Sequence, residues 1–167
     1  MATSTQHVDR PCREKILIGI GNEYRGDDGL GLLVAREIRR RALPGLRVIE
    51  ASGEGTALIA TWQGAHCVLV VDAVTCGQLP GTLYRFDASR VQIPTDFFHY
   101  SSHTFGLAEA IEMARNLHEL PPAMFVYGIE GQSYESEVGL SAVVLKCVPS
   151  LIHLIEKDLQ APARMVS

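Results

Sequence analysis

The segment KILIGIGNEYRGDDGLG, residues 15–31, decides the fold class of this sequence. Its first six residues are almost all apolar, which is typical of a short strand buried on both faces of a sheet. A loop with glycines follows, and then Leu30, Leu33, Val34 and Ile38 recur at the spacing of an amphipathic helix. The segment therefore predicts a strand, a loop and a helix, in that order.

The same alternation continues along the chain. Further strands are expected at Arg47–Ala51, Cys67–Val71, Thr82–Phe86 and Met124–Ile129, and further helices around residues 56–63, 107–117 and 144–159, the last kinked or split at Pro149. Apolar strands that alternate with helices predict an α/β fold of three layers, in which helices cover both faces of a mostly parallel, twisted, five-stranded sheet. Ligands of such sheets bind beyond the carboxyl ends of the strands.

The composition fits one domain. Of the 167 residues, 47% are hydrophobic and 20% are charged, which excludes a disordered or collagen-like chain. We expect a flexible extension over residues 1–14, one domain over residues 15–159 and a frayed tail over residues 160–167. No apolar run approaches the ~18 residues that span a membrane, and no signal peptide is expected.

Charge and cysteine content narrow the function classes further. The net charge of -4 argues against a general nucleic-acid binder, and the basic cluster of Arg36, Arg39, Arg40 and Arg41 suits the negative end of a helix dipole. The four cysteines are scattered without metal-ligand spacing. We therefore expect reduced thiols and a cytoplasmic protein.

The loop after the first strand is a poor dinucleotide-binding loop. It begins as GIG, but Tyr24 stands where the third glycine of a GxGxxG fingerprint would be needed. Two adjacent aspartates, Asp27 and Asp28, would also repel a pyrophosphate. Glu50, near the end of the second strand, is weak support for ribose binding by itself.

Three residues could instead form a metal site at the carboxyl edge of the sheet. One of Asp27 and Asp28 can cap the following helix, which leaves the other free to point over the strand ends. Asp72 ends the apolar third strand, where a carboxylate is costly unless it is paired or metal-bound, and His103 stands at the start of a helix. Separately, these residues are explained by a helix cap, an Asx-turn and an ordinary histidine; together, Asp28, Asp72 and His103 make an incomplete ligand set for a divalent metal.

The motifs, taken jointly, resemble the hydrogenase maturation proteases, which trim the C-terminus of the large subunit of [NiFe] hydrogenases. The resemblance rests on GIGNEYRGDDGLG (Gly19 to Gly31), VVDAV (Val70 to Val74) and SSHTFGLAEAI (Ser101 to Ile111). It also includes PGT (Pro80 to Thr82) and ESEVGLS (Glu135 to Ser141), and it covers roughly residues 15 to 159. It implies a phosphorylase/hydrolase-like α/β fold and an endopeptidase that acts after nickel insertion.

The resemblance also implies the site residues. The family's metal ligands fall on Asp28, Asp72 and His103, and Asp27 takes the position before the first ligand. Nickel carried by the large-subunit precursor is the expected metal, although zinc or cadmium could occupy such a site. Because no GxSxG elbow is present and Cys76 is a weak nucleophile candidate, we expect hydrolysis by water, with Asp28 or Asp72 as base.

Two other functions remain open at this stage. Peptidyl-tRNA hydrolases also have a GxGN turn after the first strand, but they need a histidine soon after it, where this chain has the two aspartates. A non-catalytic binding module for nickel or a small ligand would have the same fold. The aromatic loop Phe97 to Tyr100 could dock the tail of a protein substrate, or it could simply pack in the core.

Overall fold

Five strands alternate with helices in the computed structural model, which describes residues 14–98, 105–136 and 138–160. The strands are β1 (Lys15–Ile20), β2 (Leu46–Ala51), β3 (Cys67–Val74), β4 (Leu83–Asp87) and β5 (Ala123–Glu130). The α-helices are α1 (Leu30–Arg40), α2 (Gly55–Trp62), α3 (Leu107–Asn116) and α4 (Ala142–Gln160), and the short 3-10 helices are η1 (Gly26–Gly29) and η2 (Thr95–Phe98). Except for Glu14 and Gln160, the expected extension and tail lie outside the described residues.

The sheet has the strand order β2-β1-β3-β5-β4. The strands β2, β1, β3 and β5 are parallel to one another, and the edge strand β4 runs antiparallel to β5. The predicted α/β class and the mostly parallel five-stranded sheet are therefore confirmed. Register pairs Asp72 with Gly128 and Val74 with Glu130, so the carboxyl ends of β3 and β5 are level.

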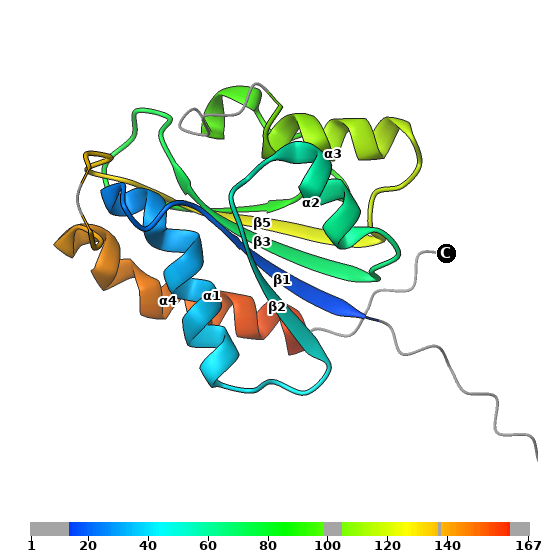
Figure 1. Cartoon of the computed structure of the whole chain (residues 1–167), viewed down its shortest axis with the longest axis horizontal. Helices are drawn as coiled ribbons and strands as arrows, with labels where there is room; N and C mark the ends of the chain where they lie inside the picture. The colour runs from blue at the N-terminus through cyan, green and yellow to red at the C-terminus, as the bar shows by residue number, and fades with distance from the viewer. Residues whose placement is uncertain (1–13, 99–104, 137, 161–167) are drawn as a thin grey trace, which may run out of the picture.

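Helices cover both faces of the sheet, as predicted (Figure 1). Apolar side chains of α2 and α3 pack on one face, against a cluster that includes Ile18, Val70 and Val126. The helices α1 and α4 pack on the other face, against Leu69 and Tyr127 among others. This alternation along each strand decides on which side a polar residue of the sheet emerges.

Close packing of α1 on the sheet depends on Gly31. A Cβ at this position would lie 2.1 Å from the carbonyl oxygen of Ile20 and 2.4 Å from that of Val71. The first turn of α1 can therefore approach the carboxyl ends of β1 and β3 only because residue 31 has no side chain. This contact sets the loop between β1 and α1 directly above the strand ends.

The structure differs from the sequence predictions at two of these elements. Strand β3 continues through Asp72 to Val74, because it pairs with β5 over its whole length. The helix α4 runs without interruption past Pro149, which is exposed, so the predicted split is wrong. Among the described helices, none is long and apolar enough to cross a membrane.

Candidate functional site

The polar residues predicted as a site gather at the carboxyl edge of the sheet. The loops that leave β1, β3 and β5 all lie at this edge, on the left of Figure 1. The 3-10 helix η1 carries both Asp27 and Asp28 and follows β1, while Asp72 belongs to β3 itself. Parallel strands and close packing of α1 bring these two segments together.

Asp72 is a buried carboxylate on the face of the sheet covered by α2 and α3. Its neighbours Val71 and Ala73 face the other layer, and its own side is shared with Val70 and Val74. The residue is 6% exposed, and the hydrogen bond that the described residues give its carboxylate comes from the backbone N–H of Ala73, at 2.8 Å. Such weak compensation leaves the charged form poorly solvated.

The pKa of the Asp72 carboxyl is accordingly raised well above its ordinary value. Burial is the main cause, the negative charge of Asp28 adds to the rise, and the hydrogen bond from Ala73 opposes it. The 3-10 helix that carries Asp28 contacts the strand that carries Asp72, which is consistent with this influence of one carboxylate on the other. The structure thus brings together two of the three predicted site residues.

Asp28 is half-buried in η1, at the same carboxyl edge of the sheet. Its backbone N–H donates to the carbonyl of Arg25, and its carbonyl accepts from the backbone N–H of Asn22 at 3.1 Å, so the turn around it is closed on both sides. Burial raises the pKa of its carboxyl, and the positive charge of Arg25 lowers it in part. Two neighbouring carboxylates with raised pKa values are typical of a metal or acid–base site.

Neither aspartate caps α1, contrary to the expectation from sequence. Gly29 is the N-cap residue and makes no side-chain cap. Asp27 is fully buried, and its carboxylate accepts four hydrogen bonds, from the backbone N–H groups of Gln132, Ser133 and Ser141 and from the hydroxyl of Ser141. Its role is to join η1 to the loop between β5 and α4.

Glu130 is a third buried carboxylate at this edge, beside Asp27 and Asp72, and it was not among the residues predicted from the sequence. It ends β5, is 2% exposed, and accepts hydrogen bonds from the backbone N–H groups of Cys76 and Gly77 and from the Cys76 thiol. The hydroxyl of Tyr84 lies 3.1 Å from the same sulfur. The sequence does contain a signal for Glu130, since this carboxylate directly follows an apolar run, as Asp72 does.

His103, the third predicted ligand, lies outside the described residues. The described residues on either side of its segment are anchored at the carboxyl edge. The carbonyl of Phe97 accepts from the backbone N–H of Thr75 at 3.2 Å, and the carbonyl of Phe105 accepts from that of Gly55 at 3.0 Å. Among the described residues, no three His, Cys, Asp or Glu side chains form a group that could hold a metal.

The aromatic loop is part of the core where it can be described. Phe97 meets Tyr84 and Phe86 edge to face, at centroid distances of 4.9 and 5.1 Å, and Phe98 is buried. These contacts favour packing over substrate docking for both residues. Tyr100, the other aromatic residue of the loop, lies outside the described residues.

Ion pairs occupy the other polar groups that the sequence singled out. Glu50 bonds Arg36 and Arg39, at 2.9 and 2.6 Å, so its carboxylate is engaged rather than poised for a ribose. Arg40 pairs with Glu37 and Arg41 with Glu156. The basic cluster is therefore matched by carboxylates of the same chain.

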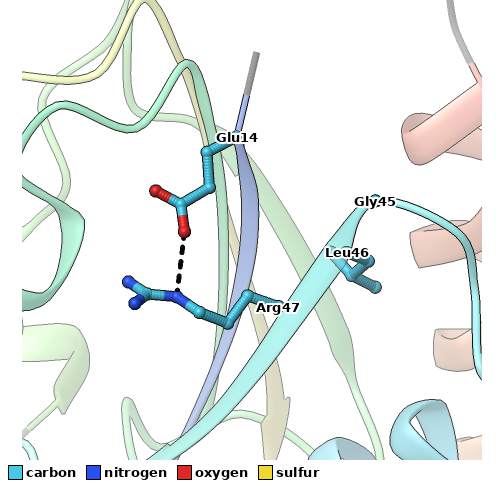
Figure 2. A pocket seen from close by; sticks show the side chains of 4 residues that line it. All are labelled: Glu14, Gly45, Leu46 and Arg47. Atoms are coloured by element: carbon cyan, nitrogen blue, oxygen red, sulfur yellow. Dashed lines mark ion pairs between the residues drawn. The ribbon is translucent and has the colours of Figure 1, made fainter. Parts of the chain in front are cut away.

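A surface hollow lies at the opposite, amino edge of the sheet. Glu14, Gly45, Leu46 and Arg47 line it, and Figure 2 shows the side chains of Glu14 and Arg47 turned toward each other. Their ion pair measures 3.1 Å and both groups are exposed, so it contributes little stability. This hollow is separate from the carboxyl edge, where the carboxylates of Asp28 and Asp72 are.

Comparison with known proteins gives a consistent result. The model of the family described as hydrogenase maturation protease, HycI, matches residues 32–158. The chain is 23% identical over 133 residues to the hydrogenase 2 maturation protease of Escherichia coli, a match that covers 77% of this chain and 80% of that protein. It is 30% identical over 129 residues to the hydrogenase expression/formation protein HupD of Rhodobacter capsulatus, covering 75% of this chain and 61% of HupD.

Solved structures support the fold assignment. The hydrogenase maturating endopeptidase HybD of E. coli superposes with a TM-score of 0.74 at 17% identity, and the match covers 88% of this chain and 92% of that one. At this identity the superposition shows a common fold. The shared α/β fold extends over nearly the whole of both chains.

Proposed function

Because the chain belongs to the hydrogenase maturation protease family, we propose that its carboxyl edge is where the large-subunit precursor of a [NiFe] hydrogenase binds and is cut. The protein is a hydrogenase maturation endopeptidase that processes the C-terminus of the [NiFe] hydrogenase large subunit. The observation that carries the location of the site is the pair Asp28 and Asp72, two carboxylates at one edge of the sheet, on the contacting elements η1 and β3, of which the first raises the pKa of the second. We place the reaction in the cytoplasm.

In this proposal, Asp28, Asp72 and His103 together bind the nickel that the precursor already carries. The chemistry of the donor set fits a borderline divalent ion, because carboxylate oxygen and imidazole nitrogen both bind such ions. Buried Asp72 has one described hydrogen bond, so its carboxylate keeps acceptor capacity for a ligand. Zinc or cadmium could occupy the same position in the isolated protein.

Asp28 and Asp72 also suit general-base chemistry on a water molecule. Burial raises the pKa of both carboxyls, which moves them from weak bases toward the range useful near neutral pH. A bound divalent ion would polarise the scissile carbonyl. Within the pair, one carboxylate can accept the proton of water while the other stays in place as a ligand.

The precursor would approach the edge from its exposed side. The three most exposed large apolar side chains of the described chain are Tyr24, Leu79 and Val138, at 67%, 81% and 78%. They lie in the loops that follow β1, β3 and β5 respectively. Contiguous apolar surface marks sites that contact a partner, and we propose that these three side chains contact the tail of the precursor.

The test is cleavage of nickel-loaded precursor by single variants. We expect Asp28→Asn, Asp72→Asn and His103→Ala each to reduce cleavage by at least about a hundredfold, a typical effect for loss of one acid–base or charge-stabilising group. Asp96→Asn is the matched control, since this exposed aspartate lies in η2, outside the carboxylate pair. It should cleave at the wild-type rate.

Precursor without nickel separates recognition from chemistry. If the three residues bind the precursor's nickel, the wild-type protein should leave nickel-free precursor uncut. Full activity of Asp72→Asn on loaded precursor would refute the assignment of the site. Intact precursor in the presence of bound metal would instead favour a binding module without catalysis.

A further inference from the structure

Asp27 has a buried side chain at the carboxyl edge that accepts four hydrogen bonds, and the reaction proposed above does not use it. Its two carboxylate oxygens are 2.7 and 3.0 Å from the backbone nitrogens of Gln132 and Ser133, and 2.7 and 2.9 Å from the nitrogen and hydroxyl of Ser141. Its own backbone N–H donates to the carbonyl of Ser133 at 2.9 Å. All four groups that meet the carboxylate are donors, which is the arrangement that a buried negative charge requires.

The neighbouring Asp28 is oriented by the same turn. Both residues belong to η1, and consecutive side chains of a 3-10 helix project about 120° apart. When Asp27 is fixed toward the loop between β5 and α4, the side chain of Asp28 is directed to another side. The 3-10 helix η1 contacts β3, and the charge of Asp28 raises the pKa of Asp72, so this side is the one toward β3.

The turn that carries Asp27 and Asp28 is closely packed against the end of β1. Gly21, at φ of +150°, passes so close to the turn that a Cβ there would lie 1.9 Å from the carbonyl oxygen of Asp28. The bond from Asn22 to that same carbonyl closes the turn on itself. On its far side, the turn is attached to the loop between β5 and α4 by the carboxylate of Asp27 and by the backbone N–H of the same residue.

We propose that Asp27 is a positioning residue, which sets the place of the Asp28 carboxylate relative to Asp72 by tying η1 to the Gln132–Ser141 loop. This inference rests on the proposed function of Asp28 and Asp72. The two adjacent aspartates therefore have different tasks: one is buried and holds the turn, and the other is at the site. The same bonds fix the loop that carries Val138 at the rim.

The test compares Asp27→Asn with a matched variant, Asp158→Asn. An amide at residue 27 would turn an NH₂ group toward N–H donors, so at least one of the four bonds is lost. Asp158 is also largely buried and hydrogen-bonded, by Arg85 and Tyr127, but it belongs to α4 and lies away from the carboxyl edge. Both variants should unfold at lower temperature than the wild type.

The two variants should differ in catalysis. Cleavage of nickel-loaded precursor is measured well below the unfolding midpoints of both variants. The kcat of Asp27→Asn should fall by about ten- to a hundredfold, since small displacements of a reacting group have effects of this size, and its KM should change by less than about threefold. Cd²⁺ affinity of the isolated protein, measured by calorimetry, should fall by about tenfold. Asp158→Asn should keep the wild-type kcat and Cd²⁺ affinity.

Wild-type kcat and Cd²⁺ affinity in Asp27→Asn would overturn the inference. If that variant does not fold, the test uses Ser141→Ala, which removes one of the four hydrogen bonds to Asp27. The kcat of Ser141→Ala should fall by about two- to fivefold, and an unchanged kcat would overturn the inference. Asp28→Asn, assayed in parallel, separates the two proposals. Full activity of Asp28→Asn refutes the proposed site, whereas an inactive Asp28→Asn beside a fully active Asp27→Asn refutes only the positioning role.

Discussion

Replacing Asp72 by asparagine should make the metal-free protein more stable while it abolishes cleavage. The carboxylate is 6% exposed and receives one described hydrogen bond, which an amide oxygen can also accept. Removing the buried charge should therefore stabilise the fold by about 1–2 kcal/mol at neutral pH, a gain common for substitutions that relieve an unfavourable site. In a domain of this size that raises the midpoint of thermal unfolding by about 2–8 °C.

The pH dependence of this gain follows from the raised pKa of Asp72. The unfolded chain releases this proton near pH 4, whereas the folded chain keeps it to higher pH. Between these two pKa values the folded state binds more protons than the unfolded state, so wild-type stability falls as pH rises. Asp72→Asn has no titrating group at this position. The difference in stability between this variant and the wild type should therefore grow across the pH window between the two pKa values and stay constant above it.

The assay is thermal unfolding of chelator-treated protein at about pH 4, where the window begins, and at about pH 8. We expect nearly equal midpoints for Asp72→Asn and wild type at the lower pH and a higher midpoint for the variant at the higher pH. Asp96→Asn, at an exposed position, should follow the wild type at both values. A variant that is less stable than wild type at pH 8, or a difference independent of pH, would refute the reasoning.

Three further predictions concern the surroundings of the site. Asp28→Asn removes a charge that raises the pKa of Asp72, so the pKa of Asp72 should be lower in this variant. When unfolding midpoints are measured against pH, the loss of stability caused by ionisation of Asp72 should therefore end at a lower pH in the variant than in the wild type. Gly31→Ala places a Cβ 2.1 Å from a carbonyl oxygen of β1, and chemical denaturation should show a loss of about 3 kcal/mol or more, or no folded protein. Tyr127→Phe removes the 2.6 Å bond to Asp158, and the same denaturation assay should show a loss of about 1–3 kcal/mol with cleavage unchanged.

Strand and helix positions were predictable because each apolar pattern is local. The run from Cys67 to Val71 is apolar on both faces, and so it indicates a central strand without knowledge of its neighbours. The end of that strand was not predictable. Asp72 reads as a strand terminator in sequence, but pairing with β5 carries the strand two residues farther, to Val74. Strand length here is fixed by a partner strand whose paired residues lie 56 positions farther along the chain.

The site was predictable in its location and only partly in its residues. The carboxyl edge follows from the parallel sheet, and Asp72 is conspicuous because a carboxylate interrupts an apolar run. Glu130 at the end of β5 gives the same signal, and it proves to hold the loop after β3 through Cys76 and Gly77. A buried carboxylate at a strand end therefore indicates a need for a positively polarised partner, which a metal ion or the N–H groups of a loop can equally supply.

The pair Asp27 and Asp28 shows why local rules could not assign these tasks. A helix cap would have required only the next few residues, and either aspartate could have supplied it. The donors that Asp27 meets come instead from Gln132, Ser133 and Ser141, more than 100 positions along the chain. Burial of one carboxylate by a distant loop leaves its neighbour half-exposed beside Asp72, so the division of labour between adjacent, chemically identical residues is a property of the tertiary fold.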